Sequence, residues 1–414
     1  MSVSAVDMSR PRLPAYGLFA ALLASAGLPI YIHAPKFFVD EYGVSLASLS
    51  GVLFALRLLD VVQDPLLGRL AERVRARRDT AVAIAGGLMA AAMLGLFAVT
   101  PPVSPLIWFA LMLTIVFSGF SFLTINFYAQ GVAKASELGE RGHLRLARWR
   151  ETGALIGICL ASVAPVAFGA VMDRPFAGFA VVFAVLALAS MTVMRPEWDA
   201  STQPPSDGFS TILKDSIARR LLLIAFLNAA PVAVSSTLFL FYVESRLAAP
   251  GMEGPLLLLF FLSAALAAPF WGNVAERIGP KTTLLAAMVL AILSFGGALF
   301  LGAGDVWLFG VVCVMSGFAL GADLTLLPAI FARRMAEISP NAAEGFGLWA
   351  FMSKFTLAFA AVLLLPTLEA SGFQSGADNP AAALDLLGML YAGVPVALKL
   401  AAIALLATTN LKEN

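Results

Sequence analysis

Three ionisable side chains share one face of an apolar segment near residue 60. Arg57, Asp60 and Asp64 are spaced by three and four residues, which places them on one side of an α-helix. Two carboxylates one turn apart repel each other unless a cation sits between them, and their oxygens are hard ligands that suit sodium or a proton. We therefore expect a monovalent cation site on this face, which must point into the protein.

The composition of the chain is that of a membrane protein. Of 414 residues, 60% are hydrophobic and 13% are charged, a balance that water-soluble domains do not carry. Basic and acidic residues number 27 and 26, so there is no electrostatic reason to expect nucleic acid as a partner. Lipid is the expected solvent, and an ionisable group near the bilayer centre must be paired, hydrated or liganded.

Twelve apolar stretches are long enough to cross a bilayer, which takes about 20 residues. A polar segment rich in Pro, Ser and Asp separates six of them from the other six. The predicted organisation is an N-terminal six-helix bundle, 1–195, a cytoplasmic linker, 196–217, and a C-terminal six-helix bundle, 218–414. The predicted spans are 14–36, 46–70, 79–100, 104–132, 146–171, 175–195, 218–244, 252–275, 280–302, 305–332, 343–368 and 383–408.

The loops on the two sides of the predicted membrane differ in basic residues. One side carries Lys36, Arg174 and Arg246, and the other carries a larger set that includes Arg73, Arg75, Arg77, Arg78, Arg141, Arg145, Arg277, Lys281, Arg333 and Arg334. By the positive-inside rule, both termini and the linker are expected in the cytoplasm, with the chain in a bacterial inner (plasma) membrane.

The two halves repeat each other at a constant offset of 204 residues. The segment 65–73, PLLGRLAER, is echoed by 269–277, PFWGNVAER, and 38–40, FVD, is echoed by 242–244, YVE. A parallel duplication of six helices is the arrangement of major facilitator transporters, whose solute path lies between the halves. We predict an all-α membrane protein with twelve transmembrane helices in two six-helix bundles of this fold.

The repeated segment also resembles the signature loop of that superfamily, with the pattern Gly-x-x-x-acid-Arg. It contains Glu72 and Arg73 in the first half and Glu276 and Arg277 in the second. We expect these four residues to act in gating, with Glu72 and Arg277 pairing across the cytoplasmic face when the inner gate is shut.

The repeat bears on a purely structural interpretation of the charged face, in which Arg57 merely pairs with the two aspartates. At the 204-residue offset, the three positions become Phe261, Ala264 and Ala268. The second half closes the same scaffold without these charges, which favours a role beyond packing.

Lys354 lies in the middle of the eleventh predicted span and needs a carboxylate partner. Asp60 or Asp64 is the expected counter-ion, because the second and eleventh helices face each other across the interface in this superfamily. The formal charge of the deep residues Arg57, Asp60, Asp64, Asp323 and Lys354 is minus one, so one bound monovalent cation would neutralise them.

Other polar residues within the spans have two interpretations each. Asp323, Asn126 and Asn228 taken singly favour interhelical hydrogen bonding over a site role. Near the start of the fifth span, Arg148, with Arg150 and Glu151, can either serve function or snorkel to the interface. Lys399 is interpreted as a snorkelling residue.

The segment 57–68, RLLDVVQDPLLG, resembles the helix-two motif of the glycoside-pentoside-hexuronide:cation symporters, the melibiose permease family. The resemblance implies that Asp60 and Asp64 bind the coupling sodium, lithium or proton. It also implies that Lys354 matches the helix-eleven lysine of that family, near its cation and substrate sites, and that Arg148 matches its helix-five arginine. Helix count and register agree over nearly the whole chain, but the specific motif is confined to helix two.

The chain departs from that family in the sugar site. Melibiose permease holds galactosyl hydroxyls with two aspartates where this chain has Ala24 and Asn126, and it has a tryptophan where this chain has Gln130. Without acidic acceptors, sugar hydroxyls would lose partners in a dry pocket. We therefore expect cation coupling without galactoside specificity, and a lining that leans towards an amphipathic solute, with Phe122, Phe127, Tyr128, Trp149, Trp349, Phe351 and Phe355.

These observations predict a cation-coupled secondary active symporter of a small organic solute, driven by sodium or a proton, that works by alternating access as a single chain among membrane lipids. An enzyme is disfavoured because no nucleophile with a base, metal cluster or phosphate loop is present, and no cofactor is expected. The expected solute-facing residues are Asn126, Gln130, Arg148 and Trp349, with Asn228 and Asp323 as further candidates.

Three other functions are alternatives to the symporter. A proton-driven exporter of lipophilic compounds would use Arg57 with Asp60 as a proton relay, and distant animal relatives that move lysolipids make a lysolipid-type transporter conceivable. A non-transporting membrane partner predicts no solute flux and no effect of charge neutralisation. The direction of flux and its response to sodium distinguish a symporter from an exporter.

Overall fold

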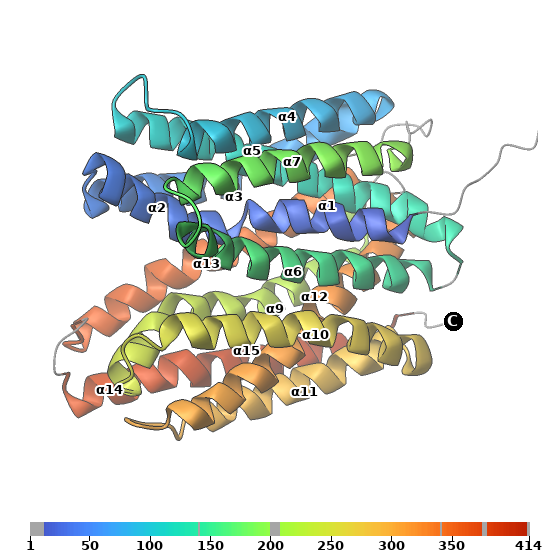
Figure 1. Ribbon diagram of the computed structural model, residues 1–414. Coiled ribbons are helices and arrows are strands. Elements are labelled where there is room, and N and C mark those ends of the chain that lie inside the picture. Colours follow the sequence, from blue (N-terminus) through green and yellow to red (C-terminus); the bar gives the residue numbers. More distant parts are fainter. Residues whose placement is uncertain (1–11, 140, 199–207, 340–341, 375–378, 412–414) are drawn as a thin grey trace, which may run out of the picture.

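The chain folds into two helical bundles that lie side by side (Figure 1). The computed structural model describes residues 12–139, 141–198, 208–339, 342–374 and 379–411. These residues form helices and turns and no strand, as the sequence predicts. In hydrocarbon the backbone polar groups have no water to bind, and a helix satisfies them within its own segment.

The helices follow the predicted spans closely. The N-terminal bundle contains α1 (Leu13–Ser25), α2 (Leu28–Tyr42), α3 (Leu46–Arg73), α4 (Arg78–Phe97), α5 (Pro105–Glu137), α6 (Gly142–Gly169) and α7 (Pro175–Met194). The C-terminal bundle contains α9 (Ser216–Phe241), α10 (Glu253–Ile278), α11 (Pro280–Ala298), α12 (Val306–Ile338) and α13 (Ala343–Ala370), and its last span consists of α14 (Ala381–Gly388), η4 (Met389–Gly393) and α15 (Val394–Ala407).

The predicted linker is described only in part. A short helix, α8 (Phe209–Lys214), precedes α9. Asp215 caps α9 by accepting a hydrogen bond from the backbone N–H of Ala218, which satisfies one of the free donors at a helix start. Residues 199–207 of the predicted linker lie outside the described residues.

Ten helices in the described chain are long and apolar enough to cross a membrane by themselves. The other two spans have identifiable reasons for being less apolar or shorter. The first is divided into α1 and α2 because Gly27 has a ψ of −117°, outside the helical range, which interrupts the hydrogen-bond ladder. The second is α3, whose 28 residues include Arg57, Asp60 and Asp64.

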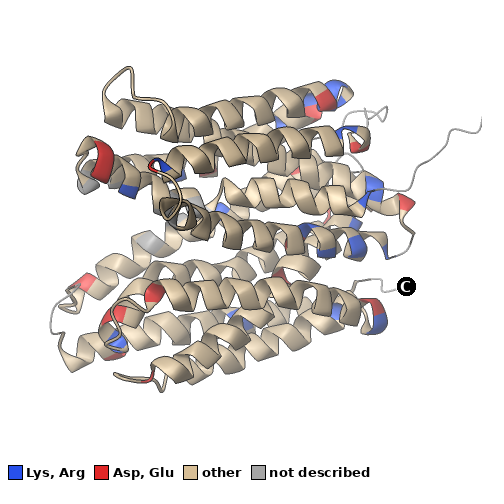
Figure 2. Ribbon diagram, in the orientation of Figure 1, with Lys and Arg blue, Asp and Glu red and all other residues tan. Residues whose placement is uncertain are grey.

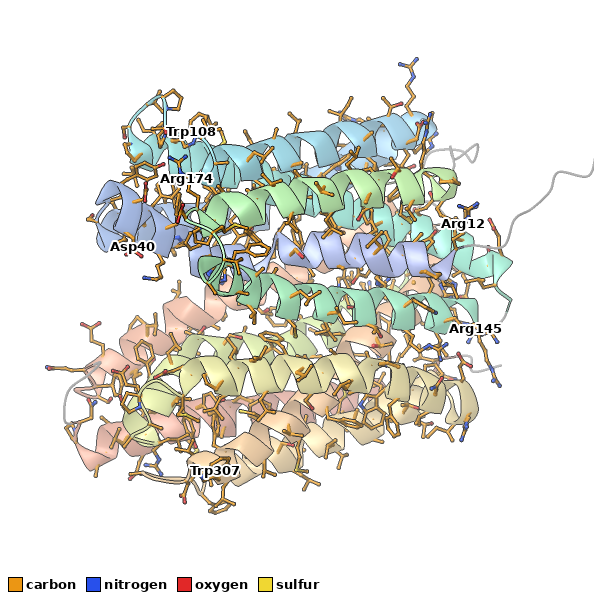
Figure 3. The ribbon with its side chains drawn as sticks, viewed as in Figure 1. Arg12, Asp40, Trp108, Arg145, Arg174 and Trp307 are labelled. Atoms are coloured by element: carbon orange, nitrogen blue, oxygen red, sulfur yellow. The ribbon has the colours of Figure 1, made fainter. Side chains whose placement is uncertain are left out.

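The helix ends alternate between two faces of the molecule. We call the face that carries the described chain ends, Arg12 and Leu411, the terminal face, and the other the opposite face. Figure 3 shows Arg12 and Arg145 at the terminal face and Asp40 and Arg174 at the opposite face. Most Lys and Arg positions lie towards the terminal face (Figure 2).

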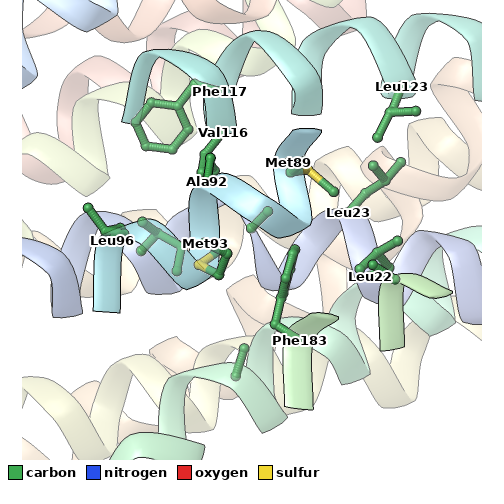
Figure 4. Close-up of a cluster of buried hydrophobic side chains, with 14 of the residues drawn as sticks. Leu22, Leu23, Met89, Ala92, Met93, Leu96, Val116, Phe117, Leu123 and Phe183 are labelled. Atoms are coloured by element: carbon green, nitrogen blue, oxygen red, sulfur yellow. The ribbon is translucent and has the colours of Figure 1, made fainter. Parts of the chain in front are cut away.

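The buried apolar side chains show where the bundles touch. One cluster belongs to the N-terminal bundle alone and includes Met93, Phe117 and Phe183 (Figure 4). A second, which includes Leu238 and Leu364, belongs to the C-terminal bundle alone. A third is shared by both bundles and lies towards the terminal face, with Ala71, Val132, Leu144, Leu326 and Phe346 among its members. The bundles are therefore packed together at the terminal face.

Glycines bring α3 and α13 together within this contact, which we call the α3–α13 seam. A Cβ atom on Gly68 would lie 3.1 Å from the carbonyl oxygen of Ala343, and one on Gly347 would lie 3.0 Å from that of Asp64. Backbone atoms occupy the space that a larger side chain would need. The two helices can approach this closely only because both positions are glycine.

A second pair, the α6–α10 seam, uses the glycine that the repeat predicts. Gly272 is the equivalent of Gly68 in the second half, and a Cβ atom there would lie 2.8 Å from Cδ of Arg148 on α6. The duplicated segment therefore places a glycine against the other bundle at both seams.

Candidate functional site

Lys354 of α13 lies beside both aspartates of α3. Its Nζ donates hydrogen bonds to Asp64 Oδ1 at 3.1 Å and to Ser121 Oγ on α5 at 2.6 Å, and it lies 3.5 Å from Asp60 Oδ1. One ammonium reaches both carboxylates because residues four apart share a helix face. We call Asp60, Asp64, Ser121 and Lys354 the seam cluster, since it joins the two bundles.

Two further polar residues position Asp60. The side-chain amide of Gln63 donates to Asp60 Oδ1 at 2.6 Å, and Ser118 Oγ donates to Gln63 Oε1 at 2.9 Å. Gln63, Ser118 and Ser121 were not among the predicted site residues, because none is charged. The spacing of the two serines, three residues apart on a helix that packs against α3, is the signal that could have identified them.

Asp64 is the most enclosed member of the seam cluster. Its side chain is 0% exposed, and its Oδ2 has no hydrogen-bond partner in the described part of the chain. A buried carboxylate oxygen without a partner loses its hydration without compensation. Lys354 contacts both carboxylates, and Arg57, half-buried, lies one turn before Asp60 on α3. The arrangement leaves an oxygen suited to a proton or a small hard cation.

A second buried ion pair lies inside the C-terminal bundle. Lys399 of α15 is 2% exposed and donates hydrogen bonds to Asp323 of α12 and to the side-chain carbonyl of Asn228 on α9. We call these three residues the C-bundle cluster. The interpretation of Lys399 as a snorkelling residue was wrong, because Asp323 supplies its counter-charge within the bundle and the ammonium does not reach for water.

This pair also corrects the charge count of the deep residues. The predicted sum of minus one left out Lys399, and including this buried lysine brings the formal sum to zero. The total charge of the deep residues therefore gives no argument for a bound cation. The local arrangement around Asp64 does.

A third buried group lies in the N-terminal bundle near the terminal face. Arg150 Nε donates to Glu151 Oε1 at 2.7 Å, and the Tyr128 hydroxyl donates to the same oxygen at 3.0 Å. The Arg150 guanidinium stacks over the Tyr128 ring at 3.7 Å, a cation–π contact. Arg150 and Glu151 are buried by these contacts and do not snorkel.

Comparison with known proteins agrees with this architecture. Residues 13–413 match a family model described as "MFS/sugar transport protein". The chain belongs to this family. Its members, the major facilitator transporters, are membrane carriers and not enzymes, as the sequence analysis expects. A comparison with curated proteins gives no match.

Several solved structures share the fold of this transporter. A bacterial homologue of the iron transporter ferroportin, crystallised in an outward-facing state, is 15% identical with a TM-score of 0.72, over 96% of this chain and 99% of that one. The same homologue with soaked iron is 14% identical, with a TM-score of 0.71 and the same coverage. The human organic anion transporter MFSD10 (TETRAN) is 16% identical with a TM-score of 0.63, over 95% and 98% of the two chains. At this identity the likeness concerns the fold alone.

The candidate solute residues of the transporter do not converge on the seam cluster. Asn126 is fully buried and donates to the backbone carbonyl of Phe122 at 2.9 Å. Gln130 is also buried and accepts a hydrogen bond of 2.5 Å from Arg78, an arginine that the sequence analysis had counted among the loop residues. Asn228 and Asp323 bind Lys399 within one bundle, and none of the four faces open space in this arrangement.

Arg148 and Trp349 lie at the contact between the bundles of the transporter. Arg148 donates a hydrogen bond to the Asn273 side chain across the α6–α10 seam and lies 3.9 Å from Glu276 Oε1. Trp349 packs against the apolar cluster that both bundles share and makes a tilted ring contact with Phe331 of its own bundle, with centroids 4.9 Å apart. In this arrangement the Arg148 guanidinium is part of the interface at the terminal face, and its role in facing solute stays a prediction.

The gating residues of the transporter also pair differently from the prediction. Glu276 lies 3.8 Å from Arg145 and 3.9 Å from Arg148, so the ion pair across the bundles joins α10 to α6. Glu72 lies 3.7 Å from Arg75, two residues after the end of α3, and the expected pair of Glu72 with Arg277 is not among the contacts of the described residues. The reason is geometric: α10 packs against α6, so its acidic residue meets the arginines of that helix. Arg73 and Arg277 are exposed.

Proposed function

We propose that this transporter is a cation-coupled secondary active symporter of a small organic solute, in which Asp60 and Asp64 bind sodium or a proton. The observation that carries the proposal is the contact of Lys354 with both aspartates across the seam between the bundles. In the proposed site the carboxylates and the Ser121 hydroxyl supply oxygen ligands of the kind that small hard cations prefer. Lys354 is the internal counter-ion.

The coupling of cation and solute follows because the cation and the Lys354 ammonium compete for the same two carboxylates. A cation at Asp64 would weaken the hold of that aspartate on Lys354 and free the ammonium to engage solute or a gate. The empty carrier, with Lys354 paired, and the doubly loaded carrier would both reorient, whereas the half-loaded carrier would keep an unpaired charge between the bundles. We infer that the terminal face is cytoplasmic, from its excess of arginines and lysines, which makes the present arrangement closed on the cytoplasmic side.

The surroundings of Lys354 favour a solute with an apolar part. Phe351, Phe355 and Phe359 stack in sequence along α13, with ring centroids 5.7 Å and 5.6 Å apart. Phe351 lies three residues before Lys354 and Phe355 directly follows it on the same helix. We therefore propose an amphipathic solute and not a galactoside.

The proposal is tested by cation-dependent thermal stability of the detergent-purified protein. A ligand that binds only the folded state raises stability by about 2.7 kcal/mol at a hundred times its dissociation constant. We expect sodium, lithium or a change of pH to raise the melting temperature of the wild type and to have no such effect on Asp60→Asn or Asp64→Asn. Asp40→Asn is the matched control, because Asp40 is exposed at the opposite face and pairs with Lys36.

Proteoliposome uptake completes the test. An Asp60→Asn protein that still accumulates solute against a gradient would refute the mechanism. The aromatic stack on α13 also suits lipophilic cargo, so a proton-driven exporter is the second candidate. Efflux that an inward proton gradient stimulates, without any response to sodium, would favour it.

A further inference from the structure

A cavity of about 860 Å³ lies at the terminal face, outside the seam cluster. The N-terminal bundle contributes residues 141, 143 and 144 to its wall. The C-terminal bundle contributes the ends of α9, α10 and α12 and residues 409–411. The volume is that of a site for a small organic or inorganic ligand.

The wall of this cavity is strongly basic. It contains Arg141, Arg220, Arg277, Arg333 and Arg334, and only two acidic residues. Both acidic residues already have partners: Glu337 accepts a hydrogen bond from Arg334, and Glu276 lies beside the arginines of α6. Arg334 in addition binds Asp215. Both carboxylates of the wall are therefore already paired with arginines of the protein.

Arg220 donates a hydrogen bond to the backbone carbonyl of Thr408 at 3.0 Å, which leaves three arginines of the wall. The side chains of Arg141, Arg277 and Arg333 make no hydrogen bond or ion pair with the described residues of the chain. Arg333 is half-buried, so its guanidinium is only partly hydrated. Like charges around one cavity repel each other, and each guanidinium presents a fork of donors that matches the oxygens of a phosphate.

We propose that this cavity binds a multivalent, phosphate-bearing anion that holds the two bundles together at the terminal face. Arg141 contacts the anion from the N-terminal bundle, and Arg277 and Arg333 contact it from the C-terminal bundle. Because the wall comes from both bundles, the complete site exists only while this face is closed. The anion therefore binds the closed arrangement more tightly than the open one and shifts the population towards it.

Inorganic pyrophosphate is the soluble probe for this site. The detergent-purified full chain is titrated with potassium pyrophosphate at constant ionic strength, and its melting temperature is measured. We expect a saturable rise of about 2–4 °C in the wild type, and no rise in Arg333→Gln or Arg141→Gln. These two variants alter different bundles, so the test survives if one of them does not fold.

Arg77→Gln is the matched control. Arg77 is an exposed arginine of the same face that does not line the cavity, so the variant loses the same charge and keeps the site. An equal shift in all four proteins would show a general ionic effect and overturn the proposal.

A second arm asks whether the phosphate belongs to a lipid headgroup. The same proteins are compared in bilayers of phosphatidylcholine with and without phosphatidylglycerol. Stabilisation by phosphatidylglycerol that Arg333→Gln and Arg141→Gln lose, and Arg77→Gln keeps, assigns the site to a headgroup even where pyrophosphate has no effect. If neither phosphate source produces a shift that depends on these arginines, the proposal fails.

Two measurements separate this site from the cation site and report closure. Asp64→Asn should keep its response to pyrophosphate while it loses its response to sodium, so the two proposals can fail independently. Whichever probe binds should also slow hydrogen exchange of residues 343–347, the first turn of α13 at the seam. Binding with unchanged exchange there would refute the link to closure.

Discussion

The seam cluster and the C-bundle cluster use the same chemistry in two mechanical settings. Each pairs a lysine with aspartate deep in the helical part of the molecule. The side chain of Lys354 is 22% exposed and joins two bundles, whereas the side chain of Lys399 is 2% exposed and joins three helices of one bundle. Rigid-body movement of the bundles can separate the first pair, and only disruption of a bundle can separate the second.

The difference shows where a buried ion pair can take part in a conformational change. An ion pair enclosed in one packed unit has no second state that a ligand could select, so it serves structure. An ion pair at an interface has two states, paired and separated, and a cation that prefers one carboxylate biases them. Depth in the membrane alone does not distinguish the two cases.

The largest expected effect is on stability, from Lys399→Met. The substitution leaves the Asp323 carboxylate buried without a counter-ion, which should lower the free energy of unfolding by about 3–5 kcal/mol. Lys354→Met should cost less, because movement of the bundles at the seam can admit water or a cation to the carboxylates, which no movement of this kind does inside one bundle. Thermal and denaturant unfolding of the two purified variants measures the difference, and equal losses would remove the mechanical distinction between the clusters.

A double substitution sharpens this result. Lys399→Met combined with Asp323→Leu removes both charges from the C-bundle cluster and should recover most of the loss, because apolar residues of similar volume often replace a buried pair without cost. If the double variant stays as unstable as the single one, the cluster is more than a structural pair.

The next effect concerns the seam itself. Gly347→Leu places a side chain against the backbone of α3, and overpacking of this kind costs about 1–3 kcal/mol. We expect the closed arrangement to be disfavoured and hydrogen exchange of residues 343–347 to become faster. Gly87→Leu is the control, since a Cβ atom at Gly87 has no neighbour within 4 Å. Unchanged exchange in Gly347→Leu would show that the close approach of α3 and α13 is not needed for closure.

A smaller effect is expected at the α6–α10 seam from Glu276→Gln. The pairs of Glu276 with Arg145 and Arg148 are long and partly exposed, and such pairs contribute about 0–1 kcal/mol. The variant should therefore melt within a few degrees of the wild type and lose part of its salt dependence. A loss as large as that of Lys399→Met would mean that this pair belongs with the enclosed clusters.

The smallest effect is confined to acid pH and lies outside the membrane. The hydrogen bond from Arg334 lowers the pKa of Asp215 below its ordinary value of 3.8. A lowered folded-state pKa means that this stabilisation is complete above the ordinary value and is lost as the pH falls through the lowered one. Melting temperatures of the wild type and Asp215→Asn between about pH 3 and pH 6 measure it. Any pH dependence that Asp215→Asn retains can then be assigned to other groups, the seam cluster included.

Much of the fold could be predicted because two constraints apply to every span in the same way. Each span must match the thickness of the bilayer, and its backbone N–H and C=O groups must form hydrogen bonds within the protein. The lengths of the apolar stretches located the helices, and the repeat at an offset of 204 residues related Gly68 to Gly272. The break at Gly27 was not predicted, since both sides of it are equally apolar. The linker and bundle boundaries stay predictions.

Part of the candidate site could also be predicted. Helical spacing placed Asp60 and Asp64 on one face, and the need of a buried ammonium for a carboxylate led to Lys354. Local spacing and the cost of burying a charge act within one helix, so both arguments can be made from the sequence. The roles of these residues in cation binding stay a proposal.

The sequence by itself determined the helices, the duplication and the set of residues whose charges need partners, because these follow from composition and from contacts along one helix. Only the tertiary structure decided which partners they have. Lys399 meets Asp323 across 76 residues. Glu276 meets Arg145, whereas the expected pair of Glu72 with Arg277 is not among the contacts of the described residues. Such pairings depend on which helices pack together and on where along their axes the side chains meet. The periodicity of a single span does not determine how two bundles pack.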